Sequence, residues 1–196
     1  MYIINKPHKG FAESSKVLQR GELRGFNSSL DWPDDKCKLV IFFPAAFSYV
    51  CPTEMGALKE WAHRFSQLNC QLIACSTDKP EDLKEWFATY DTLVGADESP
   101  IVSSTELPVY LDVLDITSMK ARRSSVFVSP IQPNGSEIII KQDHFPEVGR
   151  SFSELYRQLA GHLTGQYCGV DYDPDNTTVV GQANGKLILG GPDSEE

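Results

Sequence analysis

A chain of 196 residues, 41% of them hydrophobic, is long enough to bury one core. Its formal net charge of −9 argues against nucleic acid or an anionic membrane surface as the main partner. No apolar run of about 18 residues occurs, so we expect no membrane span, and the first residues do not read as a secretory signal.

In chain order, an irregular first stretch of about 37 residues, with only weak strand signals, precedes alternating strands and helices. Continuous apolar runs predict strands that are covered on both faces, and apolar residues three and four apart predict helices. The expected elements begin with a strand over 38–43, a helix over 51–68, a strand over 71–76 and a helix over 80–90 that Thr77 or Asp78 caps. A short strand over 100–102 and a helix over 106–114 that Pro108 breaks come next. The last elements are a hairpin of 123–129 and 137–141 around a turn at 133–135, and a helix that Ser151 opens and that ends near 165.

This order predicts an α/β fold with a mixed central sheet and helices on both faces. Residues 1–165 are expected to form one domain. Residues 166–196 are rich in Gly, Asp and Asn, and we expect them to form an extended C-terminal arm rather than a second packed domain.

The five cysteines are an odd number and are widely spaced, which is a poor disulfide framework for a secreted domain. A reducing compartment, and therefore a cytoplasmic location, is expected. There is no Cys-x-x-Cys pair, and the four histidines show no metal-binding spacing, so we expect neither a metal nor another cofactor. Cys70 and Cys75 lie in or beside a buried strand and are expected to be inert, and Cys37 has no evident role.

The stretch 44–54 is the most informative part of the sequence. It places Cys51 on the first turn of a helix, where unpaired N–H groups and the positive end of the macrodipole favour a thiolate. Pro52 suits the first helical position, and Glu54 is favourable in the same turn. A lone cysteine here would more often be structural, but the crowding of these residue types favours a reactive site.

Pro44, Ser48 and Cys51 resemble the Pro-x-x-x-Ser/Thr-x-x-Cys signature of the peroxiredoxins, and Val50 to Glu54 resembles the typical 2-Cys subgroup, which includes the alkyl hydroperoxide reductase C type. The resemblance implies a thioredoxin-like fold and a thiol peroxidase that reduces hydrogen peroxide and organic hydroperoxides. Cys51 would be the peroxidatic cysteine, which becomes a sulfenic acid. Ser48 would hydrogen-bond the peroxide and the sulfur, and Pro44 would shield the pocket from water.

The same resemblance assigns supporting residues farther along the chain. Arg123 would lie beside the sulfur, because 123–129 looks like the family strand that begins with arginine; alone, it could equally be a solvated surface arginine. Arg150 would pair with Glu54 and steady the active loop. Trp86 matches a family aromatic near the site, although by sequence alone it is more often simply core.

Cys168 follows the last predicted helix, and by resemblance it would be the resolving cysteine that attacks Cys51 of a partner subunit. The implied partners are a peroxide, thioredoxin or a thioredoxin-like reductant, and a second copy of the chain in a homodimer or a ring of dimers. Three alternatives stay open: a one-cysteine peroxidase that uses an external thiol, a redox-sensing or chaperone-like oligomer, and a plain structural module.

Overall fold

The computed structural model describes residues 2–4, 14–131, 135–169, 172–175, 181–183 and 186–188. The chain divides into two compact units, Met1–Arg150 and Ser151–Glu196. The separation of a domain over 1–165 from an arm over 166–196 stays a prediction. Within the described residues, none of the helices combines the length and the apolar character that crossing a bilayer requires.

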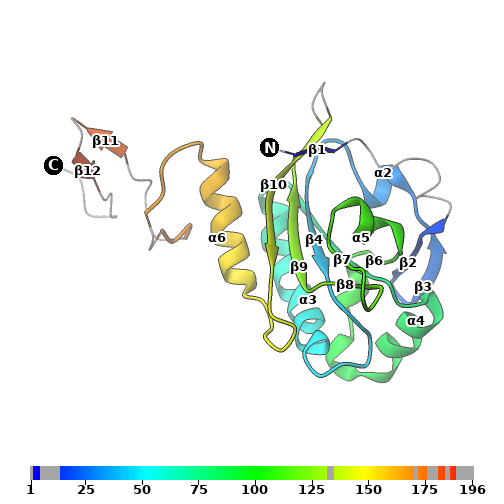
Figure 1. Cartoon of the computed structure of the whole chain (residues 1–196). Coiled ribbons are helices and arrows are strands. Elements are labelled where there is room, and N and C mark those ends of the chain that lie inside the picture. Colours follow the sequence, from blue (N-terminus) through cyan, green and yellow to red (C-terminus); the bar gives the residue numbers. More distant parts are fainter. Residues whose placement is uncertain are drawn as a thin grey trace. The chain divides into compact units, whose positions relative to one another are not determined.

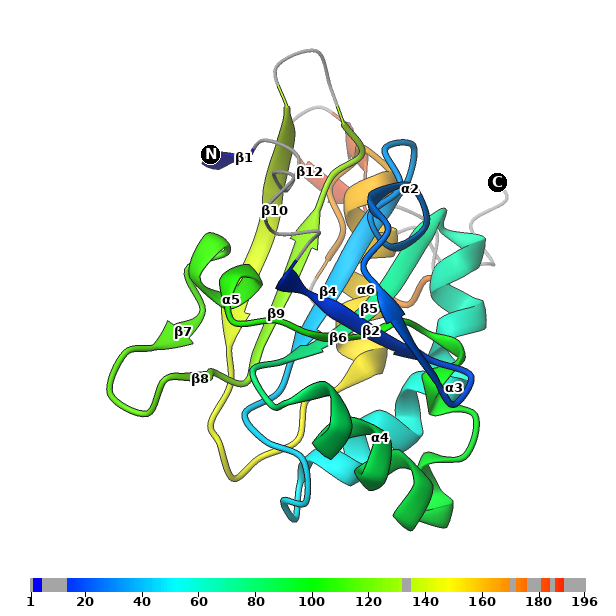
Figure 2. The same ribbon diagram turned by 90° about the vertical axis from the view of Figure 1, so that its right-hand side faces the viewer.

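The first unit is built on a mixed sheet of eight described strands in the order β1-β10-β9-β4-β5-β6-β2-β3 (Figures 1 and 2). β4 and β6 run parallel to β5, and the other neighbouring pairs are antiparallel. The strands are β1 Tyr2–Ile4, β2 Lys16–Gln19, β3 Glu22–Gly25, β4 Cys37–Phe42, β5 Cys70–Ser76, β6 Ile101–Ser103, β9 Ser124–Val128 and β10 Ser136–Asp143, with a separate pair β7 Leu114–Asp115 and β8 Lys120–Ala121.

Helices cover both faces of this sheet, as the sequence predicted (Figure 1). On one face Phe65 of α3 packs against Phe127 of β9, with ring centroids 6.4 Å apart. On the other face Leu107 of α5 and Trp32 join a buried cluster with Val40 and other alternate strand residues. The helices of this unit are α2 Ser28–Asp31, α3 Cys51–Gln67, α4 Pro80–Thr89 and α5 Glu106–Tyr110, with single 3₁₀ turns at Asp91–Leu93 and Ala96–Glu98.

β4 owes its central position to its sequence. All six of its residues are buried and all but Lys38 are apolar, because a strand with neighbours on both sides and helices above and below needs apolar side chains on both faces. The strand ends at Phe42, and the chain then runs through a short loop into α3. Cys51 therefore lies beyond the carboxyl end of β4, at the centre of the sheet's width.

Two expectations for the first unit were wrong. The first 37 residues are not merely irregular: β2 and β3 form a hairpin whose turn residues, Arg20 and Gly21, have φ values of 52° and 76°. Such left-handed pairs suit two-residue hairpin turns, but Arg-Gly lacks the usual Asn-Gly signal. Neither Thr77 nor Asp78 caps α4, whose N-cap is Lys79 with no side-chain bond. The Asp78 carboxylate instead accepts the Ala46 N–H at 2.6 Å.

The second unit contains α6, Phe152–Leu163, and a short hairpin of β11, Gly181–Ala183, and β12, Lys186–Ile188. Ser151 caps α6 by accepting the Glu154 N–H at 3.2 Å, as predicted. The Glu154 carboxylate binds Arg157 at 2.7 Å, and this contact with its hydrogen bonds lowers the carboxyl pKa to about 2.

Candidate active site

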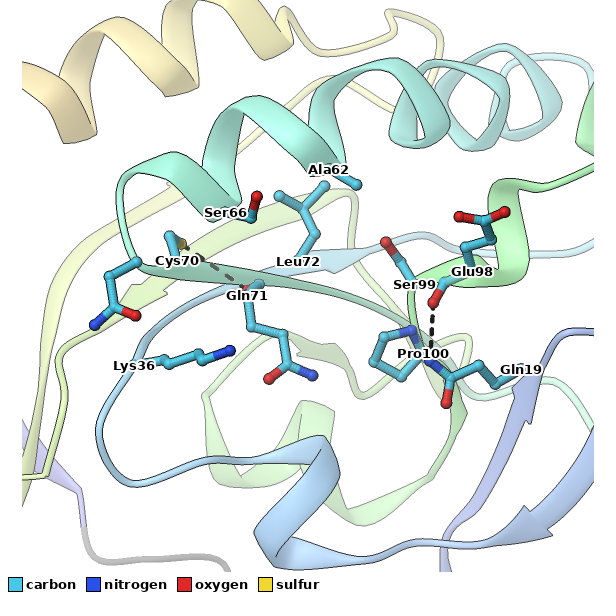
Figure 3. A pocket seen from close by; sticks show the side chains of 11 residues that line it. Gln19, Lys36, Ala62, Ser66, Cys70, Gln71, Leu72, Glu98, Ser99 and Pro100 are labelled. Carbon is cyan, nitrogen blue, oxygen red and sulfur yellow. Dashed lines mark hydrogen bonds between the residues drawn. The ribbon is translucent and has the colours of Figure 1, made fainter.

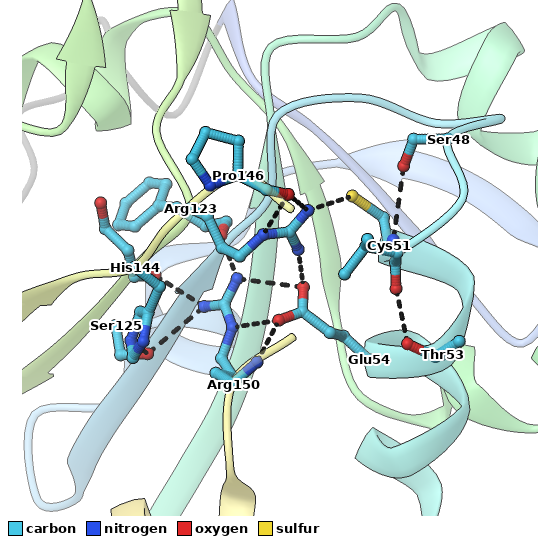
Figure 4. Close-up of polar contacts among 12 residues, drawn as sticks. Ser48, Cys51, Thr53, Glu54, Arg123, Ser125, His144, Pro146 and Arg150 are labelled. Carbon is cyan, nitrogen blue, oxygen red and sulfur yellow. Dashed lines mark hydrogen bonds and ion pairs between the residues drawn. The ribbon is translucent and has the colours of Figure 1, made fainter. Parts of the chain in front are cut away.

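Cys51 is the first residue of α3, and its side chain is fully buried (Figure 4). Val50 occupies the N-cap position and offers no side-chain cap; the Cys51 N–H donates to Ser48 Oγ at 3.3 Å, and the Thr53 N–H donates to the Val50 carbonyl at 3.1 Å. Pro52 occupies the first turn at no cost, because no N–H is needed there. A negative charge on the sulfur is favoured at this end of the helix dipole.

The loop before Cys51 is held in one conformation by two hydrogen bonds. The Ala46 N–H donates to Asp78 Oδ2 at 2.6 Å, and the Cys51 N–H donates to Ser48 Oγ at 3.3 Å. Between them Phe47 adopts a left-handed backbone with φ of 54°, which is costly for a residue with a bulky side chain. The Ser48 oxygen thus accepts from Cys51, and its own hydrogen has no acceptor among the residues that the structure describes.

Arg123 brings a guanidinium to the sulfur. Its Nη2 donates to Cys51 Sγ at 3.5 Å and to the Pro146 carbonyl at 3.0 Å, and its Nη1 forms an ion pair with Glu54. The arginine immediately precedes β9 and is 2% exposed, so the whole fork is fixed inside the protein. Its neighbour Arg122 turns away and binds Asp143 at 3.1 Å, as alternation along an extended chain requires.

Glu54 joins Arg123 to a second buried arginine. Arg150 donates to Glu54 Oε1 from its backbone N–H at 2.8 Å and from Nε at 2.9 Å. It also donates to the carbonyls of Ser124 at 2.7 Å and Phe42 at 2.5 Å, which ties the network to β9 and β4. The ion pair between Glu54 and Arg150 that the resemblance implied is therefore present.

The charges of this network do not cancel among the three residues. Arg123, Glu54 and Arg150 have side chains that are 1%, 2% and 0% exposed, and together they carry one uncompensated positive charge. Burial lowers the pKa of His144, and Arg150 lowers it further, so this nearby imidazole adds no charge at neutral pH. Buried charges need a partner, and the Cys51 sulfur lies against this positive charge, 3.5 Å from Arg123 Nη2.

Trp86 lies beneath the active loop. It is fully buried, and its ring centroid lies 5.6 Å from that of Phe43 and 6.5 Å from that of Phe47. Its indole Nε1 has no hydrogen-bond partner among the residues that the structure describes. Pro44 is half-buried between Phe43 and the rest of the loop. Both residues therefore shape the loop from positions that are not bonded to the sulfur.

Cys168 belongs to the second unit, where it lies against the last turn of α6. Its sulfur is 3.8 Å from the Gly161 carbonyl oxygen and 3.8 Å from Thr164 Oγ1. A Cβ on Gly161 would lie 3.3 Å from this sulfur, so the glycine makes room for it. The side chain is only half-buried, in contrast to the other four cysteines.

Three contributors to the site were not predicted. The carbonyl of Pro146 orients Arg123, the hydroxyl of Ser125 contacts His144 at 3.1 Å, and the carboxylate of Asp78 anchors the loop. A backbone carbonyl leaves no mark in a sequence, and the other two contacts depend on strand pairing. Within the described residues, no three His, Cys, Asp or Glu side chains gather in a way that could hold a metal ion.

A buried sulfur beside fixed cationic donors is suited to nucleophilic attack by a thiolate. The chain is similar to known proteins in both sequence and fold. Residues 19–130 match the AhpC/TSA family. A thioredoxin peroxidase of Fasciola hepatica is 31% identical over 194 residues, which cover 92% of this chain and 93% of the relative. Peroxiredoxin 2 of Drosophila melanogaster is 29% identical, over 90% of this chain and 91% of its own.

The fold comparison agrees with the sequence comparison. The crystal structure of Enterococcus faecalis AhpC superimposes with a TM-score of 0.69 at 28% identity, over 84% of this chain and 94% of that one. The predicted thioredoxin-like fold is thereby confirmed. The chain belongs to the AhpC/TSA family of peroxiredoxins, and it is a thiol peroxidase.

Proposed function

We propose that this enzyme reduces hydrogen peroxide and organic hydroperoxides through a sulfenic acid on Cys51, which Cys168 of a partner subunit converts into an intersubunit disulfide. The observation that supports this proposal most strongly is the 3.5 Å contact between Arg123 Nη2 and Cys51 Sγ inside a network with one uncompensated positive charge. The catalytic roles of Ser48, Pro44 and Arg123 and the supporting role of Trp86 are part of the proposal.

In the first step the Cys51 thiolate attacks one oxygen of the peroxide, and the O–O bond breaks. The sulfur becomes a sulfenic acid, and the departing oxygen takes a proton and leaves as water or an alcohol. The Arg123 guanidinium donates hydrogen bonds to the peroxide oxygens as negative charge develops on them, since Glu54 and the Pro146 carbonyl already hold it in place. The Ser48 hydroxyl donates its free hydrogen to the peroxide.

In the second step the Cys168 sulfur attacks the sulfenic sulfur, water leaves, and a disulfide links two chains. Partial exposure of Cys168 and its position just after α6 support this role. A thiol-containing reductant then restores both cysteines. Thioredoxin or a thioredoxin-like protein fits best, because relatives are named thioredoxin peroxidase and thioredoxin-dependent peroxide reductase. A homodimer is the smallest assembly that this route needs, and a ring of dimers also satisfies it.

The test is stopped-flow peroxide consumption by the wild type and by Cys51→Ser and Cys168→Ser, each with and without thioredoxin. Cys51→Ser should lose consumption, and Cys168→Ser should keep one rapid turnover but stop cycling with thioredoxin. Cys75→Ala is the matched control, because Cys75 is buried on β5 outside the network. A non-reducing gel should show a Cys51–Cys168 linked dimer after one equivalent of peroxide.

Other results would support other mechanisms. Continued cycling of Cys168→Ser, with oxidised protein that stays monomeric, would establish a one-cysteine peroxidase. Negligible turnover by large oligomers that hold unfolded proteins would establish a chaperone-like role. The cytoplasmic location stays a prediction.

A further inference from the structure

A second pair of thiols lies on the sheet, apart from the network around Cys51. Cys37 is the first residue of β4 and Cys70 is the first residue of β5, and the parallel register places them directly opposite each other. Their side chains are 4% and 2% exposed, respectively. The sequence assigned neither cysteine a role, because their opposition depends on strand pairing between residues far apart in the chain.

The two side chains lie on the same face of the sheet. Residues in register on parallel neighbours point to one side, and alternate residues point to the other. Val40 and Phe42 of β4 belong to the buried cluster on the α5 side, together with Ile73 and Cys75 of β5. Cys37 and Cys70 have the opposite parity in their strands, so they face the side that α3 covers, whereas Cys75 faces away from them.

Each thiol donates to a backbone carbonyl, Cys37 to that of Lys38 at 4.0 Å and Cys70 to that of Gln71 at 4.0 Å, and the two thiols interact electrostatically across the strand pair. This contact lowers the pKa of Cys37, and the nearby Lys38 ammonium adds to the effect. The same contact and burial raise the pKa of Cys70. By contrast, burial alone raises the pKa of Cys75.

The backbone spacing suits a covalent link. Neighbouring strands lie about 4.8 Å apart, and disulfides form when the two Cα atoms are about 4.4–6.8 Å apart with side chains on the same side. Both cysteines begin their strands, next to the turns at Lys36 and Asn69, where the backbone can adjust with little loss of pairing. No other two cysteines among the described residues are register partners.

A cavity of about 210 Å³ reaches Cys70 of this pair (Figure 3). Cys70 lines it together with polar groups of Lys36, Ser66, Gln71 and Glu98. A hydroperoxide is small and polar enough to enter such a space. The cavity thus supplies an approach to Cys70, which its low exposure would otherwise deny.

We propose that Cys37 and Cys70 form a second redox site, at which a hydroperoxide converts the paired thiols into a disulfide within one chain. The thiolate of one of these two cysteines attacks a peroxide oxygen, the O–O bond breaks, and the departing oxygen takes a proton to leave as water or an alcohol. The other cysteine then attacks the sulfenic sulfur, and the hydroxyl leaves as water with the proton of this second thiol. The two sulfurs together lose two electrons, and the peroxide gains them.

The disulfide is detected by peptide mapping of the full-length protein. Wild type and the Cys51→Ser/Cys168→Ser double variant are treated with excess hydrogen peroxide, denatured, alkylated and digested without reduction. A protease that cleaves after acidic residues is needed, because Lys36 and Lys38 flank Cys37 and trypsin would leave a dipeptide. Fragmentation of the linked peptide distinguishes Cys70 from Cys75.

The double variant should lose two alkylatable thiols, Cys37 and Cys70, and recover both on treatment with dithiothreitol. Cys75 should remain alkylated in full. Adding Cys37→Ser or Cys70→Ser to the double variant should abolish the link. If these variants fail to fold, the peptide map of the wild-type protein still tests for the link, because it needs neither substitution. Full alkylation of Cys37 and Cys70 after peroxide, or oxidation of one without a link to the other, overturns the proposal.

This outcome is independent of the proposed reaction at Cys51. A chain that consumes peroxide rapidly but never links Cys37 to Cys70 refutes only the second site. A chain that forms the link but does not turn over peroxide refutes only the function proposed for Cys51.

Discussion

Arg123 Nη2 lies 3.5 Å from Cys51 Sγ although 72 positions of sequence separate the two residues. β4 and β9 are direct neighbours in the sheet, so the end of one strand and the start of the other meet at the same edge. The sulfur and the guanidinium are brought together by this pairing. The contact makes Arg123 the first residue to test by substitution.

Arg123→Met should lower kcat/KM for peroxide by about 100-fold or more, the usual cost of losing one oriented donor to a developing charge. Arg123→Lys should recover little, because an ammonium cannot reproduce the fork that engages Cys51, Glu54 and the Pro146 carbonyl. Stopped-flow kinetics measures both. Arg122→Met is the control, since Arg122 binds Asp143 instead, and equal effects at the two positions would refute the role of Arg123.

Glu54→Gln should destabilise the fold by about 3–5 kcal/mol, because it leaves two buried guanidinium groups without their shared carboxylate. Urea unfolding of the reduced protein measures the change in the free energy of unfolding. Glu60→Gln on the exposed face of α3 is the control and should change it by less than about 0.5 kcal/mol. A loss at Glu54 no larger than at Glu60 would show that the buried network contributes little.

Asp78→Asn should loosen the active loop. The Asp78 carboxylate accepts the Ala46 N–H at 2.6 Å and the Ser76 hydroxyl at 2.7 Å, and hydrogen bonds to a charged group contribute about 1.5–3 kcal/mol each. The Ala46 amide should therefore exchange with solvent faster, as measured by hydrogen exchange. Asp82→Asn, at an exposed position of α4, should leave that exchange unchanged. Unaltered protection of Ala46 in Asp78→Asn would mean that the loop does not depend on this anchor.

His144 should make stability depend on pH below neutrality. Its pKa in the folded protein lies below the ordinary value of 6.5, chiefly because of burial and then because of Arg150. Between the folded pKa and 6.5 the unfolded chain binds the proton more readily, so the free energy of unfolding falls as the pH drops through this window.

Unfolding curves at a series of pH values test this dependence. His144→Gln should reduce the decrease in the free energy of unfolding at lower pH, whereas His63→Gln, at an exposed position of α3, should not. An unchanged slope in His144→Gln would assign the dependence to other groups.

The sequence predicted the parts of the site that lie close together in the chain. The helix that starts at Cys51 follows from the apolar run before it and from Pro52 and Glu54. The positions of Arg123 and Arg150 came from resemblance, because strand order cannot be read from apolar patterns alone. The turn at Arg20 and Gly21 was missed for want of a typical turn pair, and Asp78 was misassigned because its partner, Ala46, lies on another loop.

The most direct test of the account is where the first oxygen from peroxide goes. Cys168→Ser protein receives less than one equivalent of hydrogen peroxide at neutral pH in the presence of a sulfenic acid trap, and each cysteine is then quantified by mass spectrometry. We predict that the trapped adduct accumulates on Cys51 almost alone and that the Arg123→Met substitution in the same background removes this preference. Adduct spread evenly over the remaining cysteines, or peroxide left unconsumed, would contradict the account.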